Sequence, residues 1–150
     1  MGDMRGLTLA HHVLYTRYMI TLLLALTIST AEAKLNLFEH NTIALAAMAN
    51  GIETTTMIKI AKIESNHNRK AKRLNLNGSI DIGMFQINSV HWNSTCKDLD
   101  VFSLGGNTEC AARLILAAKR HAGKDRNWIG RYHSKTPHLK RAYVAKLALE

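Results

Sequence analysis

Apolar positions recur with helical spacing over much of the chain, and the segment 55–64 shows this most clearly. Its apolar positions follow the i, i+3, i+4 rule of one helical face: Met57, Ile60 and Ala61. Glu64 takes the next position of the same stripe. The pattern therefore predicts an amphipathic helix that carries a carboxyl group on its apolar face.

The remaining segments predict a mostly helical α+β fold with one small hairpin. A first helix is expected over Leu37–Asn50, ended by Asn50-Gly51, and Thr54 or Thr55 is the expected cap of the Glu64 helix. The segment 74–82 alternates around Asn77-Gly78, which is typical of a hairpin. Three further helices are expected: a short one through Phe85-Gln86-Ile87, one capped near Asn107 or Thr108 and ending at Gly123, and one opened by Pro137.

Glu64 is the first candidate for chemistry. A carboxyl group held against apolar side chains resists ionisation, so it can donate a proton near neutral pH. Lys59 and Lys62 fall on the opposite side of the predicted helix and are poorly placed to neutralise it. The alternative is an ordinary glutamate at a helix end that turns out to water. The helix alone leaves both interpretations open.

Asp81 is the second candidate, because the hairpin places it in a different environment. Ile80 and Ile82 share one strand face, so Asp81 lies on the opposite, polar face. Two carboxyls in contrasting environments are the arrangement that separates an acid from an ionised partner. Gln86 and Asn88 supply neutral hydrogen-bonding groups suited to amides and hydroxyls. The alternatives are an aspartate that stabilises the hairpin and, for Gln86, a structural amide.

The length of 150 residues fits one domain preceded by a targeting segment. Residues 19–28 form an apolar run after Arg17, and Ala31-Glu32-Ala33 is typical of a signal-peptidase site. The run is shorter than the roughly 20 residues that span a bilayer, which disfavours a membrane anchor. We therefore expect a signal peptide over 1–33, a domain over 34–150, and a periplasmic location.

The net charge is +9, and residues 34–150 carry all of it. A basic exported surface favours anionic wall polymers or lipids. The sequence has no arginine-rich run and no interleaving of aromatic and basic residues, the features typical of a nucleic-acid groove. Nucleic acid is therefore not an expected partner. Charge alone narrows the function little.

Cys96 and Cys110 are the two cysteines of the sequence. In an exported chain their spacing favours one disulfide, worth about 3 kcal/mol, over two free buried thiols. The histidines are scattered and form no pair at metal-ligand spacing with each other or with a cysteine. No metal site and no cofactor are expected.

Two longer runs of sequence resemble a known family. They are Ile60-Ala61-Lys62-Ile63-Glu64-Ser65-Asn66-His67-Asn68 and the segment 75–89, which contains Gly83-Met84-Phe85-Gln86-Ile87-Asn88. Both resemble the lysozyme-like soluble lytic transglycosylases, and most of all the small exported enzymes that accompany secretion systems, conjugation machinery and pili. The resemblance covers roughly Phe38–Tyr143 and implies a lysozyme-like fold.

The resemblance also implies roles for particular residues. Glu64 is the expected catalytic acid, and Ser65, Met84, Phe85, Gln86 and Tyr132 are the expected substrate-binding residues. Phe85 stands where the family usually has Met, and His133 where it usually has Asn. The same run is similar to animal-type lysozyme, whose second carboxylate falls where Asp81 falls here, so Asp81 is a second catalytic candidate. That lysozyme has four disulfides, whereas this chain can form one.

Three functions follow as hypotheses. The first is a monomeric lytic transglycosylase that cleaves peptidoglycan glycan strands to 1,6-anhydromuramyl products and opens the wall for a secretion or conjugation apparatus. The second is a muramidase that hydrolyses the same bond with Glu64 and Asp81. The third is a weakly catalytic peptidoglycan-binding assembly factor. The sequence does not identify the apparatus.

Overall fold

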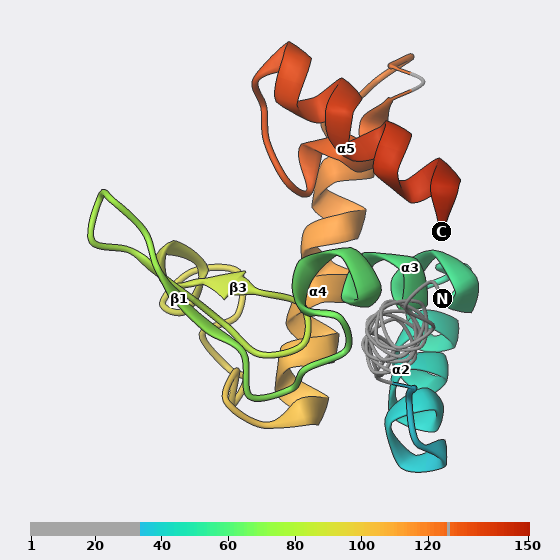
Figure 1. The fold of residues 1–150 in the computed structure, drawn as a ribbon, viewed down its shortest axis with the longest axis vertical. Helices are drawn as coiled ribbons and strands as arrows, with labels where there is room; N and C mark the ends of the chain where they lie inside the picture. The colour runs from blue at the N-terminus through green and yellow to red at the C-terminus, as the bar shows by residue number, and fades with distance from the viewer. Residues whose placement is uncertain (1–33, 126) are drawn as a thin grey trace, which may run out of the picture. The chain divides into compact units, whose positions relative to one another are not determined.

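The computed structural model describes residues 34–150 except position 126 (Figure 1). The expected signal peptide at 1–33 lies outside the described residues. The described elements are the helices α2 (Leu37–Ala49), α3 (Thr54–Ser65), α4 (Leu104–Arg120) and α5 (Pro137–Leu149), the strands β1 (Lys72–Leu74), β2 (Ile80–Ile82) and β3 (Ile87–Asn88), and the short 3-10 helices η1 (Ser89–His91) and η2 (Trp128–Arg131). This confirms a mostly helical fold with a small antiparallel sheet.

The first two helices begin and end for local reasons. Asn36 and Glu39 form a reciprocal capping box at the start of α2, which ends one residue earlier than expected. The cap of α3 is Glu53, whose side chain makes no capping bond, so the expectation of a threonine cap is wrong. Asn66 ends α3 in the left-handed conformation, with φ 53°. Glu64 therefore lies in the last turn of α3.

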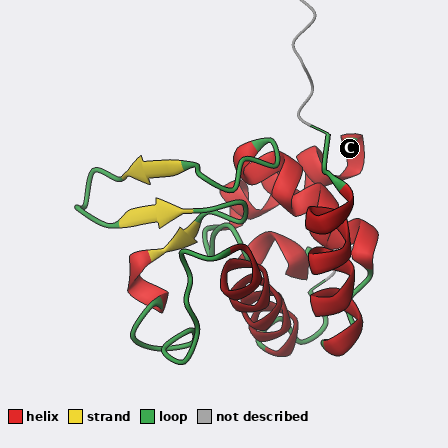
Figure 2. Ribbon diagram, turned by 90° about the horizontal axis from the view of Figure 1, so that it is seen from below, coloured by secondary structure: helices red, strands yellow, loops and turns green. Residues whose placement is uncertain are grey.

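The sheet has three strands rather than the two of a hairpin (Figure 2). The expected hairpin is present, with Arg73 opposite Asp81. The short helix expected through 85–87 is wrong, because two left-handed residues reverse the chain at this point. Gly83 has φ 76° and Gln86 has φ 48°, and the chain returns as β3, where Asn88 pairs with Asp81.

Helix α4 begins earlier than expected. Its cap is Ser103, whose hydroxyl accepts a hydrogen bond from the amide of Gly106. Asn107 and Thr108, the expected caps, are buried inside the helix. The Asn107 side chain instead forms hydrogen bonds with the turn at Gly83. A short stretch of sequence does not predict such a contact between distant residues.

The core lies between the helices and one face of the sheet. Helix α2 packs against α3 and α4, while α5 packs against η2 and α3. The largest fully buried apolar side chains come from α2, α3, α4, β3 and the turn that precedes β3: Ile43, Met57, Ile60, Met84, Phe85, Ile87 and Ile115. Within residues 34–150, no helix is long and apolar enough to cross a membrane.

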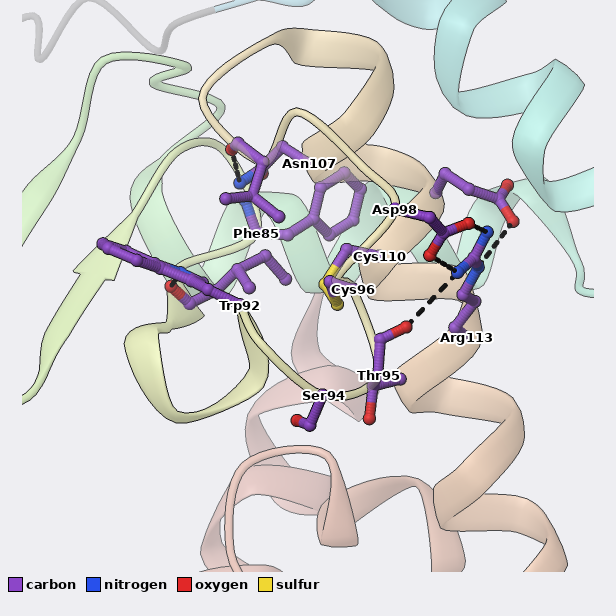
Figure 3. Close-up of a disulfide and its surroundings, with 12 residues drawn as sticks. Phe85, Trp92, Ser94, Thr95, Cys96, Asp98, Asn107, Cys110 and Arg113 are labelled. Carbon is purple, nitrogen blue, oxygen red and sulfur yellow. Dashed lines mark hydrogen bonds and ion pairs between the residues drawn. A yellow bond between two sulfur atoms is a disulfide. The ribbon is translucent and has the colours of Figure 1, made fainter.

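Cys96 and Cys110 form the predicted disulfide, with 5.4 Å between their Cα atoms (Figure 3). The bond joins the loop after η1 to α4. One turn further along α4, the Arg113 guanidinium donates to both carboxylate oxygens of Asp98 at 2.7 and 3.0 Å and to the Thr95 carbonyl at 3.3 Å. These contacts hold the loop that leads from the sheet to α4.

Candidate active site

A cleft of about 650 Å³ runs between the sheet and the helical part of the chain. Glu64 reaches it from α3, and Asp81 reaches it from β2. The cleft is also lined by residues of the hairpin, of β3 and η1, of α4 and of the segment after η2: Arg73, Asn75, Leu76, Asn77, Ser79, Gln86, Ile87, Asn88, Val90, His91, Leu114, Tyr132 and His133. The two carboxyls singled out from the sequence therefore share one site.

The surroundings of the Glu64 carboxyl favour its protonated form. Burial raises the pKa of Glu64 above 4.5, and the charge of Asp81 raises it further, whereas Tyr143, Arg73 and Lys146 lower it by less. Its Oε1 atom is buried and has no hydrogen-bond partner among the described residues. The pKa of Glu64 thus moves in the direction expected for a carboxyl on an apolar helix face, and for the expected cause, while its role as a proton donor stays a prediction.

Tyr143 is a neighbour of Glu64 that the sequence did not identify. Its side chain comes from α5 and is buried, and its hydroxyl interacts with the Glu64 carboxyl, although the two make no hydrogen bond of standard length and angle. The sequence placed Tyr143 only in the helix opened by Pro137 and gave it no role in the site. His133, at the edge of the cleft, stacks on the Tyr143 ring with 4.9 Å between ring centroids.

The surroundings of Asp81 instead favour its ionised form. The Arg73 guanidinium donates two hydrogen bonds to Oδ2, at 2.7 and 3.1 Å, and the Asn75 amide donates a third at 3.0 Å. The Asn88 amide donates to Oδ1 at 2.6 Å. Burial raises the pKa of Asp81, but these hydrogen bonds outweigh it and leave the pKa below 3.8. The predicted contrast between the two carboxyls is therefore confirmed.

The turn 83–86 shapes the cleft on the side of β3. The Asn107 side chain donates to the Ile82 carbonyl at 3.0 Å and accepts from the Phe85 amide at 3.0 Å. Gln86 adopts a positive φ, and its side-chain amide donates to the Gly83 carbonyl at 3.0 Å. The same side chain lines the cleft. A strained residue that is not glycine, held in this way at a cleft, is typical of functional sites.

Three of the expected substrate-binding residues do not line the cleft. Met84 and Phe85 are fully buried, so neither side chain can contact a ligand there, which corrects the expectation for both. The Ser65 hydroxyl donates to the Met84 carbonyl at 2.7 Å and so ties the end of α3 to the turn. Met84 and Phe85 face the core, whereas the polar side chain of Gln86 in the same turn faces the cleft. Ser65, Met84 and Phe85 therefore stabilise the walls of the site without lining it.

Tyr132 lies in the cleft wall, but its hydroxyl is engaged elsewhere. It donates to the Phe85 carbonyl at 2.8 Å, and burial raises its pKa well above 10.0. Of the two tyrosines near the acid, Tyr132 fixes the backbone of the turn, and Tyr143 interacts with Glu64. No group of three or more potential metal ligands occurs among the described residues.

Comparison with known proteins places this geometry in a family. The transglycosylase SLT domain family matches residues 41–133. The chain belongs to the transglycosylase SLT domain family. It is also 29% identical over 144 residues to lysozyme C II of Oncorhynchus mykiss, an alignment that covers 80% of this chain and 92% of the lysozyme.

Family membership gives the cleft its substrate class. SLT domains act on peptidoglycan, so this SLT chain is an enzyme that cleaves glycosidic bonds of that polymer. Glu64, Asp81, Gln86 and Tyr132 all fall inside the matched segment. Tyr143 falls beyond it, and only the packing of α5 against α3 brings Tyr143 to the acid.

Proposed function

We propose that this SLT protein is a lytic transglycosylase that cleaves the β-1,4 bond between N-acetylmuramic acid and N-acetylglucosamine and releases 1,6-anhydromuramyl products. The observation that carries the proposal is the unequal state of the two carboxyls in one cleft. Glu64 has a raised pKa and a buried oxygen with no partner. Asp81 accepts four hydrogen bonds from neighbouring side chains. The Glu64 carboxyl is therefore available for proton transfer, whereas the Asp81 carboxylate is bound to its hydrogen-bond donors.

In the first step, protonated Glu64 donates its proton to the glycosidic oxygen, and the bond from that oxygen to C1 of the muramyl residue breaks. An oxocarbenium-like centre develops at C1, and the substrate's own acetamido oxygen can stabilise it. Asp81 is held ionised and contributes negative charge to the same cleft without leaving its partners. Burial strengthens such electrostatic effects because water is excluded.

In the second step, ionised Glu64 removes the proton from the C6 hydroxyl of the same muramyl residue. The C6 oxygen attacks C1 and closes the 1,6-anhydro ring, so no water is consumed. Glu64 regains its proton, and the enzyme returns to its starting state. A single carboxyl thus serves first as acid and then as base.

Hydrolysis by a lysozyme-type muramidase is the second candidate, and the likeness to lysozyme C II favours it. In that mechanism Asp81 would attack C1 or stabilise it directly, and water would complete the reaction. The hydrogen bonds that Asp81 accepts from Arg73, Asn75 and Asn88 weaken its nucleophilicity. This is the reason to prefer the transglycosylase mechanism.

Mass spectrometry of digested sacculi tests the proposal. Anhydromuropeptides, lighter by one water than reducing muropeptides, are the expected product. Reducing ends would overturn it in favour of the muramidase. A folded protein that releases neither product would instead be a binding or assembly factor.

We also propose that the protein is exported to the periplasm and opens the wall for a secretion or conjugation apparatus. Support comes from the apolar run 19–28 with Ala31-Glu32-Ala33, and from the disulfide, which persists in oxidising compartments. Expression of the full chain should give a periplasmic form that begins at Lys34. An Ala31→Tyr/Ala33→Tyr variant should remain unprocessed, and cytoplasmic retention of the unchanged chain would contradict export.

The role with an apparatus needs a separate test. In a deletion strain of the source organism, the wild-type gene should restore secretion or conjugation, and the Glu64→Gln variant should not. Equal restoration by both would show that cleavage is not what the apparatus requires.

A further inference from the structure

A second hollow adjoins the catalytic cleft. It has a volume of about 290 Å³, and His91, Leu114 and Tyr132 line both spaces. Its remaining lining comes from the end of α4 and from the segment that follows η2: Ala117, Ala118, His121, Arg131 and Lys135. A ligand in the cleft can therefore extend past Tyr132 into this hollow without leaving the protein surface.

The charge of this hollow differs from that of the cleft. The cleft contains two carboxyls together with Arg73, which is ion-paired with Asp81. The lining of the hollow contains four basic side chains and no acidic one: His91, His121, Arg131 and Lys135. Arg131 contributes a guanidinium group and Lys135 an ammonium group to the hollow. Burial, followed by the charge of Lys135, lowers the pKa of His91, so His91 offers a neutral hydrogen-bonding ring.

These cations are not neutralised within the described part of the chain. Asp125 lies near enough to Arg131 for its pKa to be lowered by that charge, but its carboxylate is ion-paired with Lys140. Neither Arg131 nor Lys135 forms an ion pair with any side chain in residues 34–150 that the structure describes. Since Ala117 and Ala118 contribute only methyl groups, recognition in the hollow depends on its basic side chains.

The polymer that the cleft accepts carries matching groups. Muramyl residues bear a lactyl-linked stem peptide, and that peptide has free carboxylates. The hollow is at the lower end of the size of small-ligand pockets, enough for a short peptide segment beside the sugar-binding space. Guanidinium and ammonium groups bind carboxylates through charge-assisted hydrogen bonds.

We propose that the hollow formed by His91, His121, Arg131 and Lys135 is a subsite for the carboxylates of the stem peptide of the bound muramyl residue. The inference rests on the proposed action on peptidoglycan and extends it, because it makes the peptide part of what the enzyme recognises. It does not depend on whether the products are anhydro or reducing.

Binding to the inactive Glu64→Gln protein tests this subsite. The probes are a disaccharide tetrapeptide and the same disaccharide without peptide, titrated at physiological salt. Two or three partly exposed ion pairs give an expected preference of about tenfold for the peptide-bearing probe. An Arg131→Gln/Lys135→Gln change should abolish most of that preference.

The control removes the same charge elsewhere. Arg141 and Lys97 are exposed and do not line the hollow, so Arg141→Gln/Lys97→Gln should keep the preference. Equal losses in the two double variants would show general attraction to anions and overturn the subsite. A ligand-side test needs no variant at this site: amidation of the peptide carboxylates should remove the preference, and an unchanged preference would overturn the proposal.

The outcome separates this inference from the proposed function. If both probes bind equally well, the subsite is absent while the cleft still binds peptidoglycan sugars. If neither probe binds, the assignment of the substrate itself fails. If inorganic phosphate competes for the hollow as well as the peptide-bearing probe does, the hollow is a general anion site and the peptide assignment is wrong.

Discussion

The imidazole of His133 lies flat against the phenol ring of Tyr143, with the ring planes inclined by 5° and the centroids 4.9 Å apart. Tyr143 is buried, and its hydroxyl interacts with the carboxyl of Glu64. A residue at the rim of the cleft is thereby connected through one aromatic ring to Glu64. His133 is therefore in direct contact with a residue that interacts with Glu64.

Replacing Tyr143 with Phe should raise the pKa of Glu64 further. The hydroxyl is one of the groups that lower this pKa, and the substitution removes it while keeping the ring. In the pH dependence of kcat/KM, the limb governed by Glu64 should move to higher pH. The matched control is Tyr132→Phe, because that hydroxyl donates to the Phe85 carbonyl. Equal shifts in the two variants would contradict the specific role of Tyr143.

Replacing Glu64 with Gln should reduce turnover of peptidoglycan by about 10²- to 10⁴-fold, the usual contribution of a general acid or base. Release of soluble muropeptides measures the loss. Glu53 is exposed and its side chain makes no capping bond, so Glu53→Gln is the control and should keep its activity. Full activity of the Glu64 variant would refute the mechanism.

The same Glu64 variant should change how stability depends on pH. The folded-state pKa of Glu64 is raised, so the folded protein holds this proton to a higher pH than the unfolded chain does. Relative to the Gln variant, the free energy of unfolding of the wild type should fall as the pH rises above about 4.5, until the folded carboxyl has ionised. Urea unfolding at a series of pH values measures it. Parallel curves for the two proteins would argue against a raised pKa.

Replacing Asp81 with Asn should mainly lower the free energy of unfolding and should affect turnover less. The amide cannot accept the hydrogen bonds of Arg73, Asn75 and Asn88 as the carboxylate does, and the expected loss is about 1–3 kcal/mol. Because the pKa of Asp81 is lowered, its contribution is present above pH 3.8 and is lost as the pH falls through the folded-state value.

The control for Asp81 is Asp98→Asn, which removes an exposed partner of Arg113 and should cost less stability. Turnover by the Asp81 variant should fall far less than turnover by the Glu64 variant. If it fell equally far, Asp81 would act on C1 directly and the muramidase mechanism would gain support.

Replacing Gly83 with Ala should destabilise the fold severely. A Cβ atom there would lie 2.3–2.7 Å from the Asn107 side chain, and φ is 76°. Since Asn107 bridges the turn and α4, we expect a loss above about 4 kcal/mol in denaturant unfolding. Gly78 has a similar φ of 81° but open space around it, so Gly78→Ala should cost only the backbone strain, about 1–2 kcal/mol. Similar losses in both variants would contradict the role of the contact with Asn107.

Much of this molecule was predictable from short stretches of sequence. The helices over 37–49 and 54–65, the turn at Asn77-Gly78 and the start of the last helix at Pro137 depend on local periodicity and turn chemistry. The position of Glu64 on an apolar stripe depends on helical geometry alone, and its raised pKa follows from burial of that stripe. The position of Asp81 on the polar face of its strand followed likewise from the alternation of apolar and polar residues along that strand.

Other features were decided by contacts between residues far apart in the sequence. The reversal at Gly83 that leads into the third strand is held by hydrogen bonds to Asn107 of α4, a residue that the sequence predicted as a helix cap. Tyr143 reaches Glu64 only because α5 packs against α3, and the hollow beside the cleft exists only where α4 meets the segment after η2. Local sequence determines which side chains each element presents, and the packing of the elements determines which of them meet.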